Sequence, residues 1–284
     1  MDVSILVTCW NGEKLLSHNF SKVVEAAENK DNKVKEILVV DDGSSDNSVS
    51  FLKKNFPQVK VLENKRNYGY GFSCNRGMEE AKADLVAILN LDVIPDKDFL
   101  VSCLPHFEDE KVFSVSFNEG SFGPGRLAWN KGFIEIVETK PEKTTSFASW
   151  PSGGSSVFRK KLWREIGGMD EIFLPFYFED IDLGIRAEKK GYKCLWEPKA
   201  KVNHKHEATI NPENFALHKH KKDISLIKER NFLLLNWKHL DSPSDFFNHL
   251  VYLFKRAFFA PGYFKVIFSA ILRKISFSFT HEQL

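Results

Sequence analysis

The chain has 284 residues, of which 43% are hydrophobic, so it can bury a substantial core and does not have the composition of a disordered protein. Its 40 basic and 38 acidic residues leave a formal net charge of +2, which argues against a protein that mainly neutralises a nucleic-acid backbone, so we expect no nucleic-acid partner. Four cysteines without paired spacing fit neither a disulfide framework nor a structural zinc site, and they indicate a cytoplasmic protein.

Three apolar runs in the first third of the chain predict buried strands. They lie at residues 3–7, 37–40 and 85–89, and each is too short for a helix. Between the second and third runs, Ser44 or Ser45 can cap a helix that ends before Pro57. Strands that alternate with helices imply an α/β fold with a mostly parallel, doubly wound sheet.

Polar residues follow each of the three runs. Because the carboxyl ends of parallel strands meet at one edge of a sheet, and open α/β sheets bind ligands there, we expect a site at this edge. Its candidate residues are Thr8, Trp10, Asn11, Asp41, Asn90 and Asp92.

The chain carries Val-Val-Asp-Asp-Gly-Ser-Ser-Asp at residues 39–46, Leu-Asn-Leu-Asp-Val-Ile-Pro at 89–95 and Phe-Glu-Asp-Ile-Asp-Leu at 178–183. In this order the motifs resemble those of family 2 glycosyltransferases with a GT-A fold, and most of all the rhamnosyltransferase-like branch. The resemblance implies one GT-A domain over residues 1–240. It has a Rossmann-like nucleotide-sugar-binding half at 1–110 and an acceptor-binding half at 111–240, and a helical extension follows at 241–284.

The resemblance places the donor's nucleotide at the first two strand ends. Asp41 then contacts the base or the ribose, and Thr8 and Asn11 contact the base. Alternatively, Asp41 and Asp42 hydrogen-bond backbone amides of the turn that follows them. Trp10 can stack on the base or fill the space beneath it.

A glycine-containing segment before the third strand resembles a donor-binding loop of the family. By this resemblance Asn67, Gly69, Asn75 and Arg76 belong to the donor site. Arg76 can make a bidentate contact with the donor phosphate, or form a structural ion pair with Asp41 or Asp92.

The family's Asp-x-Asp motif reads Asn90-Leu91-Asp92 here. Asp92 can bind the divalent cation, Mn²⁺ or Mg²⁺, that neutralises the donor diphosphate, whereas Asn90 can hydrogen-bond a ribose hydroxyl but contributes no charge to the metal. Alternatively the two residues make a turn before Pro95. In several GT-A enzymes a His about two dozen residues after the catalytic general base, which the resemblance places at Asp180, completes the metal site. This spacing favours His204 over His206.

The acids at residues 179–182 open a predicted helix that ends near Lys189. Acids in a first helical turn are favoured by the helix dipole without any catalytic duty. The resemblance makes Glu179-Asp180 the catalytic pair. Asp180 is then the general base that takes the proton from the acceptor hydroxyl, so the product is inverted at the anomeric carbon.

The acceptor site is expected near a small, polar segment that leads into a strand at about residue 155. Trp150 is a candidate because sugars pack on aromatic faces, although a core tryptophan is an equal alternative. We also assign Gly153, Gly154 and Asp182 to this site.

The last forty or so residues have a different composition. Residues 246–281 contain no acidic residue and nine phenylalanines. The pattern predicts two amphipathic helices broken at Pro261-Gly262, which either lie in a membrane interface or form a hairpin that covers the core or a homodimer interface. We expect no signal peptide and no spanning helix, because the uncharged runs are about half the roughly twenty residues that a span needs. The basic residues of this segment are Lys255, Arg256, Lys265, Arg273 and Lys274.

Together these features predict a metal-dependent, inverting glycosyltransferase of surface polysaccharide synthesis. It would use a UDP-, dTDP- or GDP-sugar, and a glycan or lipid-linked glycan acceptor at the cytoplasmic face of the membrane. A sugar-nucleotide nucleotidyltransferase is an alternative, but residues 8–11 lack the glycine-rich loop with a basic residue that such enzymes carry. A non-catalytic glycan-binding protein is a second alternative, which Asp92, Asp180 and His204 argue against.

Overall fold

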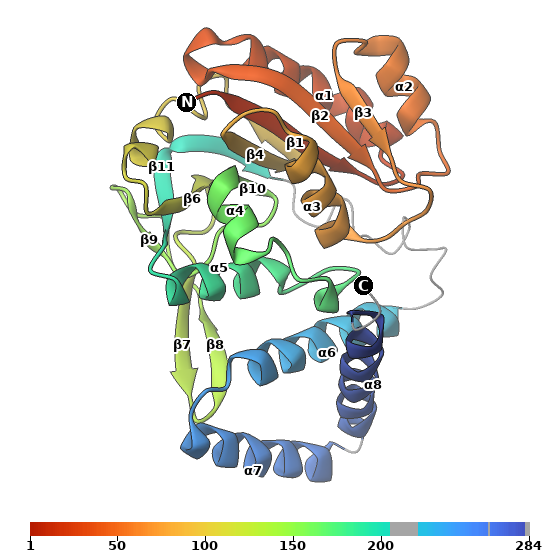
Figure 1. Cartoon of the computed structure of the whole chain (residues 1–284), viewed down its shortest axis with the longest axis vertical. Coiled ribbons are helices and arrows are strands. Elements are labelled where there is room, and N and C mark those ends of the chain that lie inside the picture. Colours follow the sequence, from red (N-terminus) through yellow and green to blue (C-terminus); the bar gives the residue numbers. More distant parts are fainter. Residues whose placement is uncertain (205–220, 261, 282–284) are drawn as a thin grey trace.

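The computed structural model describes residues 1–204, 221–260 and 262–281. These residues form a nine-stranded sheet in the order β3-β2-β1-β4-β10-β6-β11-β5, with β9 paired to β11, and a separate β7–β8 hairpin (Figure 1). The strands are β1 (Val3–Cys9), β2 (Val34–Asp41), β3 (Lys60–Glu63), β4 (Leu85–Asn90), β5 (Val93–Pro95), β6 (Val112–Asn118), β7 (Arg126–Asn130), β8 (Phe133–Val137), β9 (Ser146–Ala148), β10 (Ser155–Arg159) and β11 (Lys193–His204).

The first four strands of the sheet confirm the expected mostly parallel, doubly wound arrangement. Strands β3, β2, β1 and β4 are parallel neighbours. Alternate side chains of β1 enter two different cores, with Ile5 packed on the side of α1 (Glu13–Glu28) and Leu6 on the side of α3 (Tyr70–Glu80). The strands read as continuous apolar runs because helices cover both faces of the sheet.

The acceptor-side half continues the same sheet. Strand β10 is antiparallel and lies between β4 and β6, and β11 runs parallel to β6. The expected halves at 1–110 and 111–240 are therefore joined through strand pairing. The remaining helices of the sheet layer are α2 (Ser48–Asn55), α4 (Lys160–Ile166), α5 (Glu179–Lys189) and the short 3-10 turns η1 (Lys30–Asn32), η2 (Leu104–Glu108) and η3 (Glu171–Phe173).

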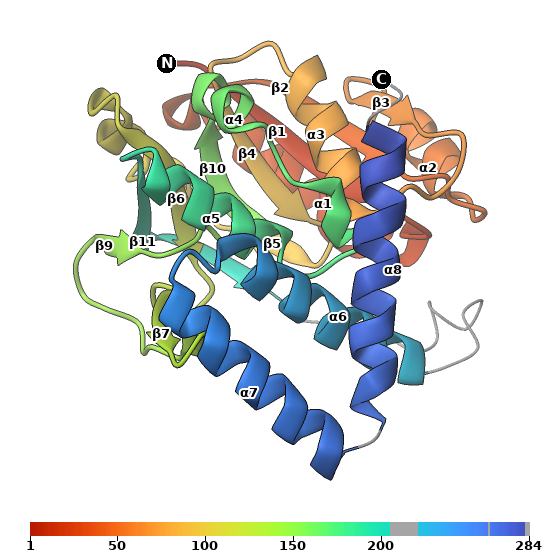
Figure 2. The same ribbon diagram turned by 60° about the horizontal axis from the view of Figure 1, so that its bottom comes forward.

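Three C-terminal helices, α6 (Lys221–His239), α7 (Pro243–Phe259) and α8 (Tyr263–His281), lie beyond α5 and the β7–β8 hairpin (Figures 1 and 2). Buried residues of all three helices, including Leu234, Leu253 and Val266, share a third core with Ile181 of α5. One face of the predicted amphipathic pair therefore covers the protein core. None of the helices in the described ranges combines the length and the apolarity that a membrane span requires.

Some element boundaries follow the sequence-based expectations and others depend on tertiary contacts. Helix α2 begins at Ser48, because the hydroxyl of Ser44 is turned toward the backbone of Asn11 instead of capping the helix. Strand β11 extends as far as His204 because it pairs with β5 after leaving β6. The break between α7 and α8 falls where Pro261-Gly262 predicted it. His206 lies outside the described residues.

Candidate active site

The polar strand ends meet at one edge of the sheet. Strand β1 lies between β2 and β4, with Thr8 opposite Asn90 and Cys9 opposite Asp41. Parallel pairing in this register places the ends of all three strands side by side. The same edge receives the turns that follow each strand, so the candidate donor residues come from three separate stretches of sequence.

Asp41 and Asn11 hold the turn after β2. The buried Asp41 carboxylate accepts hydrogen bonds from the amide of Ser44 at 2.9 Å and from its hydroxyl at 2.5 Å. Asn11, at φ +48°, accepts from the amide of Ser45 at 2.8 Å. The alternative in which Asp41 binds backbone is therefore realised. Thr8 and Trp10 are half-buried beside this turn, and the nucleotide contacts of these four residues stay a prediction.

Asp42 anchors the loop between β3 and α3. Its carboxylate accepts from the side-chain amide of Asn64 at 2.7 Å and from the backbone of Tyr68 and Gly69 at 3.0 and 2.8 Å. Gly69 has a φ of +101°, and a Cβ atom there would lie 2.9 Å from the carbonyl oxygen of Pro175. The loop is thus fixed against the segment before α5, and it leaves Asn67 exposed.

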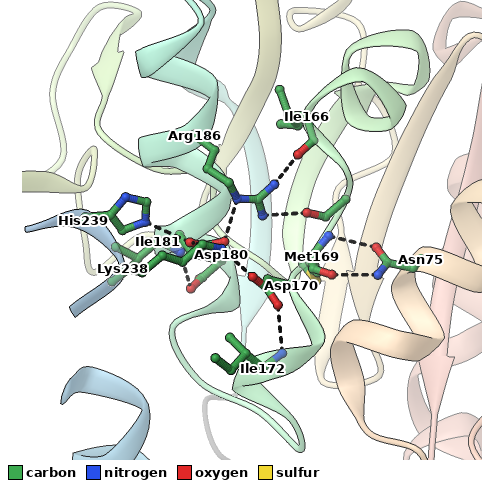
Figure 3. Close-up of polar contacts among 12 residues, drawn as sticks. Asn75, Ile166, Met169, Asp170, Ile172, Asp180, Ile181, Arg186, Lys238 and His239 are labelled. Atoms are coloured by element: carbon green, nitrogen blue, oxygen red, sulfur yellow. Dashed lines mark hydrogen bonds and ion pairs between the residues drawn. The ribbon is translucent and has the colours of Figure 1, made fainter. Parts of the chain in front are cut away.

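Asn75 and Arg76 have structural partners. The side-chain amide of Asn75 donates to the carbonyl of Met169 at 2.8 Å and accepts from its amide at 2.9 Å (Figure 3). Arg76 donates to the Glu63 carbonyl at 2.8 Å and to the side chain of Asn64. The structural partners of Arg76 are therefore Glu63 and Asn64, and not Asp41 or Asp92 as the ion-pair alternative required.

Asp92 and His204 face each other, as the proposed metal pair requires. Because His204 pairs with Val93 in the β11–β5 ladder, its Nε2 lies 3.3 Å from Oδ1 of the buried Asp92. Burial disfavours the charged imidazole, but contacts with Asp92 and Glu119 outweigh this effect and raise the pKa of His204 to about 9.

Glu119 is a site residue that the sequence reading missed. Its Oε2 lies 3.0 Å from Nδ1 of His204, and its Oε1 accepts from the hydroxyl of Ser152 at 3.0 Å and from that of Ser155. Glu119 directly follows the buried strand β6, so the rule that located the other strand-end residues also applies to it. It orients the imidazole from the side opposite Asp92.

The segment 152–155 joins the parts of the site. Gly154 accepts a backbone hydrogen bond from Asn90 at 2.8 Å, and a Cβ atom on Gly154 would lie 2.1 Å from the side-chain nitrogen of Asn90. A Cβ atom on Gly153 would lie 3.3 Å from Oδ2 of Asp180. The hydroxyl of Tyr70 donates to the carbonyl of Gly153 at 2.7 Å. Glycine at both positions therefore lets this segment pass between the end of β4 and the start of α5.

Glu179 and Asp180 open helix α5, as predicted. Asp180 accepts from the amide of Ile181 at 2.8 Å, whereas Oε2 of Glu179 is buried without a hydrogen bond. Burial raises the pKa of Asp180 to about 6, and burial followed by the neighbouring Asp180 charge raises the pKa of Glu179 to about 8. Two adjacent acids of raised pKa at a sheet edge are suited to proton transfer.

Asp182 does not belong to the acceptor site. It is fully buried, and its carboxylate contacts Arg186 at 2.7 Å and both Lys238 and His239 at 2.8 Å. Burial alone would raise its pKa, but these three partners hold the pKa of Asp182 at about 2. Sequence reasoning placed it among the acceptor residues because its ion-pair partners on α6 are distant in the chain.

Trp150 is half-buried and packs against the third core. A Cβ atom on Gly125 would lie 2.6 Å from its indole ring, and one on Gly184 would lie 2.5 Å from its Cα atom. Two glycines thus make room for Trp150. The packing alternative is realised, and contact with an acceptor stays a prediction.

Asp92 and His204 by themselves would supply only part of a coordination shell. Among the residues that the structure describes, no group of three or more His, Cys, Asp or Glu side chains is arranged to hold a metal ion. Oδ1 of Asp92 is buried without a well-formed hydrogen bond, and it faces the Nε2 atom of His204. One carboxylate and one imidazole fit Mn²⁺ when phosphate oxygens supply the other ligands, provided that His204 releases its proton as the cation binds.

The curated relatives include a polysaccharide synthase and a glycosyltransferase by name. Poly-beta-1,6-N-acetyl-D-glucosamine synthase of Staphylococcus aureus is 26% identical over 209 residues, which cover 70% of this chain and 48% of that protein. Pre-mycofactocin glycosyltransferase of Mycobacterium tuberculosis is 30% identical over 182 residues, which cover 61% of this chain and 38% of that protein. The chain thus spans about half or less of the length of these relatives.

Solved structures share the fold. GalNAc-T7 with UDP, GalNAc and Mn²⁺ aligns with a TM-score of 0.63 at 17% identity, over 83% of this chain and 47% of that one. The mannosyltransferase PcManGT from Pyrobaculum calidifontis, in complex with GDP-Man and Mn²⁺, aligns with a TM-score of 0.58 at 14% identity, over 99% and 79%. Residues 4–167, more than half of the chain, match the family described as Glycosyl transferase family 2. The chain therefore belongs to glycosyltransferase family 2 and has a GT-A fold.

Proposed function

We propose that this protein is an inverting, metal-dependent glycosyltransferase that moves a sugar from a nucleotide-sugar donor to a hydroxyl of a glycan or lipid-linked glycan. The observation that carries the proposal is the segment 152–155. Its serines bond Glu119 beside the Asp92–His204 pair, and its Gly153 lies against Asp180. One short segment thus contacts Glu119 beside the Asp92–His204 pair and also lies against Asp180. Together with family membership, this arrangement supports a site in which the leaving diphosphate binds near Asp92 and His204 and the acceptor hydroxyl binds near Asp180.

Asp180 is the proposed general base. Its Oδ1 atom is held by the amide of Ile181, and the absence of a side chain on Gly153 leaves space beside Oδ2. Oδ2 would accept the proton of the acceptor hydroxyl while that oxygen attacks the anomeric carbon from the face opposite the diphosphate, which inverts the configuration. Burial and the neighbouring Asp180 charge raise the pKa of Glu179, and its Oε2 has no hydrogen-bond partner, so Asp180, held by the Ile181 amide, is the acid of the pair that we assign as base.

Asp92 and His204 are the residues that would hold Mn²⁺ or Mg²⁺. When bound, the cation would stabilise the negative charge of the departing diphosphate. Glu119 and the paired strands β5 and β11 orient the imidazole toward Asp92. The two solved relatives that contain Mn²⁺ support this assignment.

The donor would lie across the ends of β1, β2 and β4, with its nucleotide near Thr8, Trp10, Asn11, Asp41 and the exposed Asn67. Structures with the same fold contain UDP-GlcNAc or GDP-Man, so uridine and guanosine donors are both candidates. The resemblance to the rhamnosyltransferase-like branch adds dTDP-sugars. A polysaccharide synthase among the relatives supports an acceptor of the surface-glycan class. Four buried, free cysteines fit the reducing cytoplasm.

The test is a donor screen with UDP-, dTDP- and GDP-sugars in the presence of Mn²⁺, read out as nucleoside diphosphate release with and without glycan acceptors. We expect one nucleotide class to be cleaved, and NMR of the product to show the opposite anomeric configuration to that of the donor. A product of retained configuration would contradict the role of Asp180. If the NDP-sugar is instead converted, on addition of pyrophosphate, to a nucleoside triphosphate and a sugar 1-phosphate, the protein is a nucleotidyltransferase.

A further inference from the structure

Helices α7 and α8 each present a large apolar face to the outside. The exposed side chains recur at intervals of three or four residues, which places them on one face of each helix. Phe254 is 74% exposed and Phe258 is 68% exposed, values far above those of core aromatic residues. On α7 this outer face contains Phe247, Leu250, Phe254 and Phe258, and on α8 it contains Phe264, Phe268, Ile271 and Ile275.

The opposite faces of the two helices are fixed to the protein. Leu253 of α7 and Val266 and Ala270 of α8 are buried in the core shared with α6, and Ala257 of α7 is also buried. Figure 2 shows α7 and α8 as two long helices, and their neighbouring ends lie at the end of the molecule away from the nucleotide-binding strands. The outer faces therefore belong to an ordered surface, and some other molecule must cover them if their apolar area is to leave water.

The charges on this surface differ from the sequence-based expectation of five available basic residues. Arg256 pairs with Glu229 of α6 at 2.9 Å, and Arg273 donates to the carbonyls of Ile172 at 3.0 Å and Glu171 at 2.5 Å. These two arginines are directed at the protein. The exposed cations are lysines, and each is adjacent in sequence to an exposed apolar side chain: Lys255 follows Phe254, Lys265 follows Phe264 and Lys274 precedes Ile275.

The charge pattern distinguishes between possible occupants of the surface. In a two-fold dimer the same patch occurs on both subunits, so its lysines would meet lysines, and residues 246–281 contain no acid to pair with them. A surface of dense negative charge above an apolar layer complements both the lysines and the phenylalanines. An anionic lipid bilayer has these two properties.

We propose that the outer faces of α7 and α8 dock this protein onto anionic phospholipid membranes. The phenylalanines enter the boundary between headgroups and acyl chains, and the three lysines bind the lipid phosphates. The helices lie along the interface and remain packed on α6 through their buried faces. This surface is separate from the proposed reaction site, so its test needs neither donor nor acceptor.

The experiment is co-sedimentation of the full chain with vesicles of phosphatidylcholine alone or with about 30% phosphatidylglycerol. We expect binding at least tenfold tighter to the anionic vesicles, and weaker binding as salt is raised, because the lysine contribution is screened. A Phe254→Ser/Phe258→Ser variant and a Lys255→Glu/Lys265→Glu/Lys274→Glu variant should each bind at least tenfold more weakly. Their thermal unfolding should stay close to that of the parent chain, because the substituted side chains are exposed.

Two matched variants control for changes in surface hydrophobicity and net charge. Phe147→Ser removes a phenylalanine that is 56% exposed on β9, and Lys54→Glu/Lys82→Glu/Lys111→Glu changes three exposed lysines outside the C-terminal helices. Both should bind vesicles like the parent chain. Equal loss in the controls, or no vesicle binding by the parent chain, overturns the proposal. A dimer in analytical ultracentrifugation that the Phe254→Ser/Phe258→Ser variant disrupts, without vesicle binding, would assign the surface to a second copy.

Discussion

The carboxylate of Asp182 lies 2.8 Å from Nζ of Lys238, so a buried ion pair joins the helix of the proposed base to α6. Lys238 also contacts Asp170 at 2.5 Å, and Asp170 caps the η3 turn. Asp182 also binds Arg186, which donates to the carbonyl of Ile166 (Figure 3). Arg186 donates in addition to the carbonyl of Gly168. The start of α5 is thus held from three directions by charged groups, and the C-terminal helices take part in its support.

Asp182→Asn should destabilise the protein while leaving the volume of the side chain unchanged. It leaves Arg186 and Lys238 without the buried carboxylate that faces them, and it removes a contact of His239. Breaking a fully buried pair costs roughly 3–5 kcal/mol, and because Arg186 and Lys238 are partly exposed we expect a loss at the lower end of this range. Urea unfolding at pH 7 measures the loss. The control is Asp241→Asn, because Asp241 forms an exposed ion pair with Lys189 and its loss should change the urea unfolding curve little.

The stabilisation by Asp182 should also depend on pH. The pKa of Asp182 is lowered to about 2 in the folded protein, so its contribution is fully present above the ordinary aspartate pKa of about 4. It is lost as the pH falls from about 4 through 2. The gap in unfolding free energy between the parent chain and Asp182→Asn should therefore stay constant from pH 7 to 5 and narrow below pH 4. A gap that is unchanged at pH 3 would contradict this role.

Asp180→Asn should abolish the base with little effect on donor binding. The amide retains the size of the side chain and can still accept from Ile181, but it cannot take a proton, and general-base catalysis contributes about 10²–10⁴-fold. Turnover should fall by at least about a hundredfold, and the donor dissociation constant should change little. If turnover is retained, Glu179→Gln would be tested next as the base.

The pH profile of turnover should reflect the burial of Asp180. Burial raises the pKa of this carboxyl to about 6, and only the deprotonated form accepts a proton. Turnover should therefore rise as the pH increases through about 6 and then level off. This acidic limb should disappear from the residual activity of Asp180→Asn. A limb near the ordinary aspartate pKa of about 4 would mean that Asp180 is solvated during the reaction.

Removal of the metal should stop transfer. Chelation should abolish activity, and Mn²⁺ or Mg²⁺ should restore it, because Asp92 and His204 form only part of a shell that the diphosphate completes. Asp92→Ala should weaken both Mn²⁺ and donor binding in titration calorimetry. Asp98→Ala, at an exposed position just past β5, should leave both unchanged. Full activity in a chelator would show that protein cations stabilise the leaving group.

A methyl group on Gly154 should displace Asn90. The Cβ atom would lie 2.1 Å from the Asn90 side-chain nitrogen, so the asparagine or the segment 152–155 must move. A shift of about 1 Å at a reacting centre can cost a hundredfold in rate, and we expect a loss of this order in kcat/KM for Gly154→Ala. Gly262→Ala is the matched control, because a Cβ atom there meets nothing within 4 Å.

Features that depend on short stretches of sequence could be read directly. The apolar runs at residues 37–40 and 85–89 predicted buried strands, and the polar residues after them predicted one shared edge, because parallel strands end together. The acids at 179–180 were placed correctly at the start of a helix, since an acidic first turn is a local signal. The alternation of strands and helices was sufficient for the fold class.

Features that depend on contacts between distant residues required the tertiary structure. Asp180 and Asp182 are both acids of the same first helical turn, so the sequence does not distinguish them. In the structure, Asp182 is buried in contact with Lys238 and His239 of α6, whereas Asp180 lies against Gly153. Glu119 meets His204 only because β11 runs beside β6 and then pairs with β5. The sequence thus determined which side chains could do chemistry, whereas packing and strand register decided which of them are desolvated, paired and brought together, because those properties depend on neighbours from other elements.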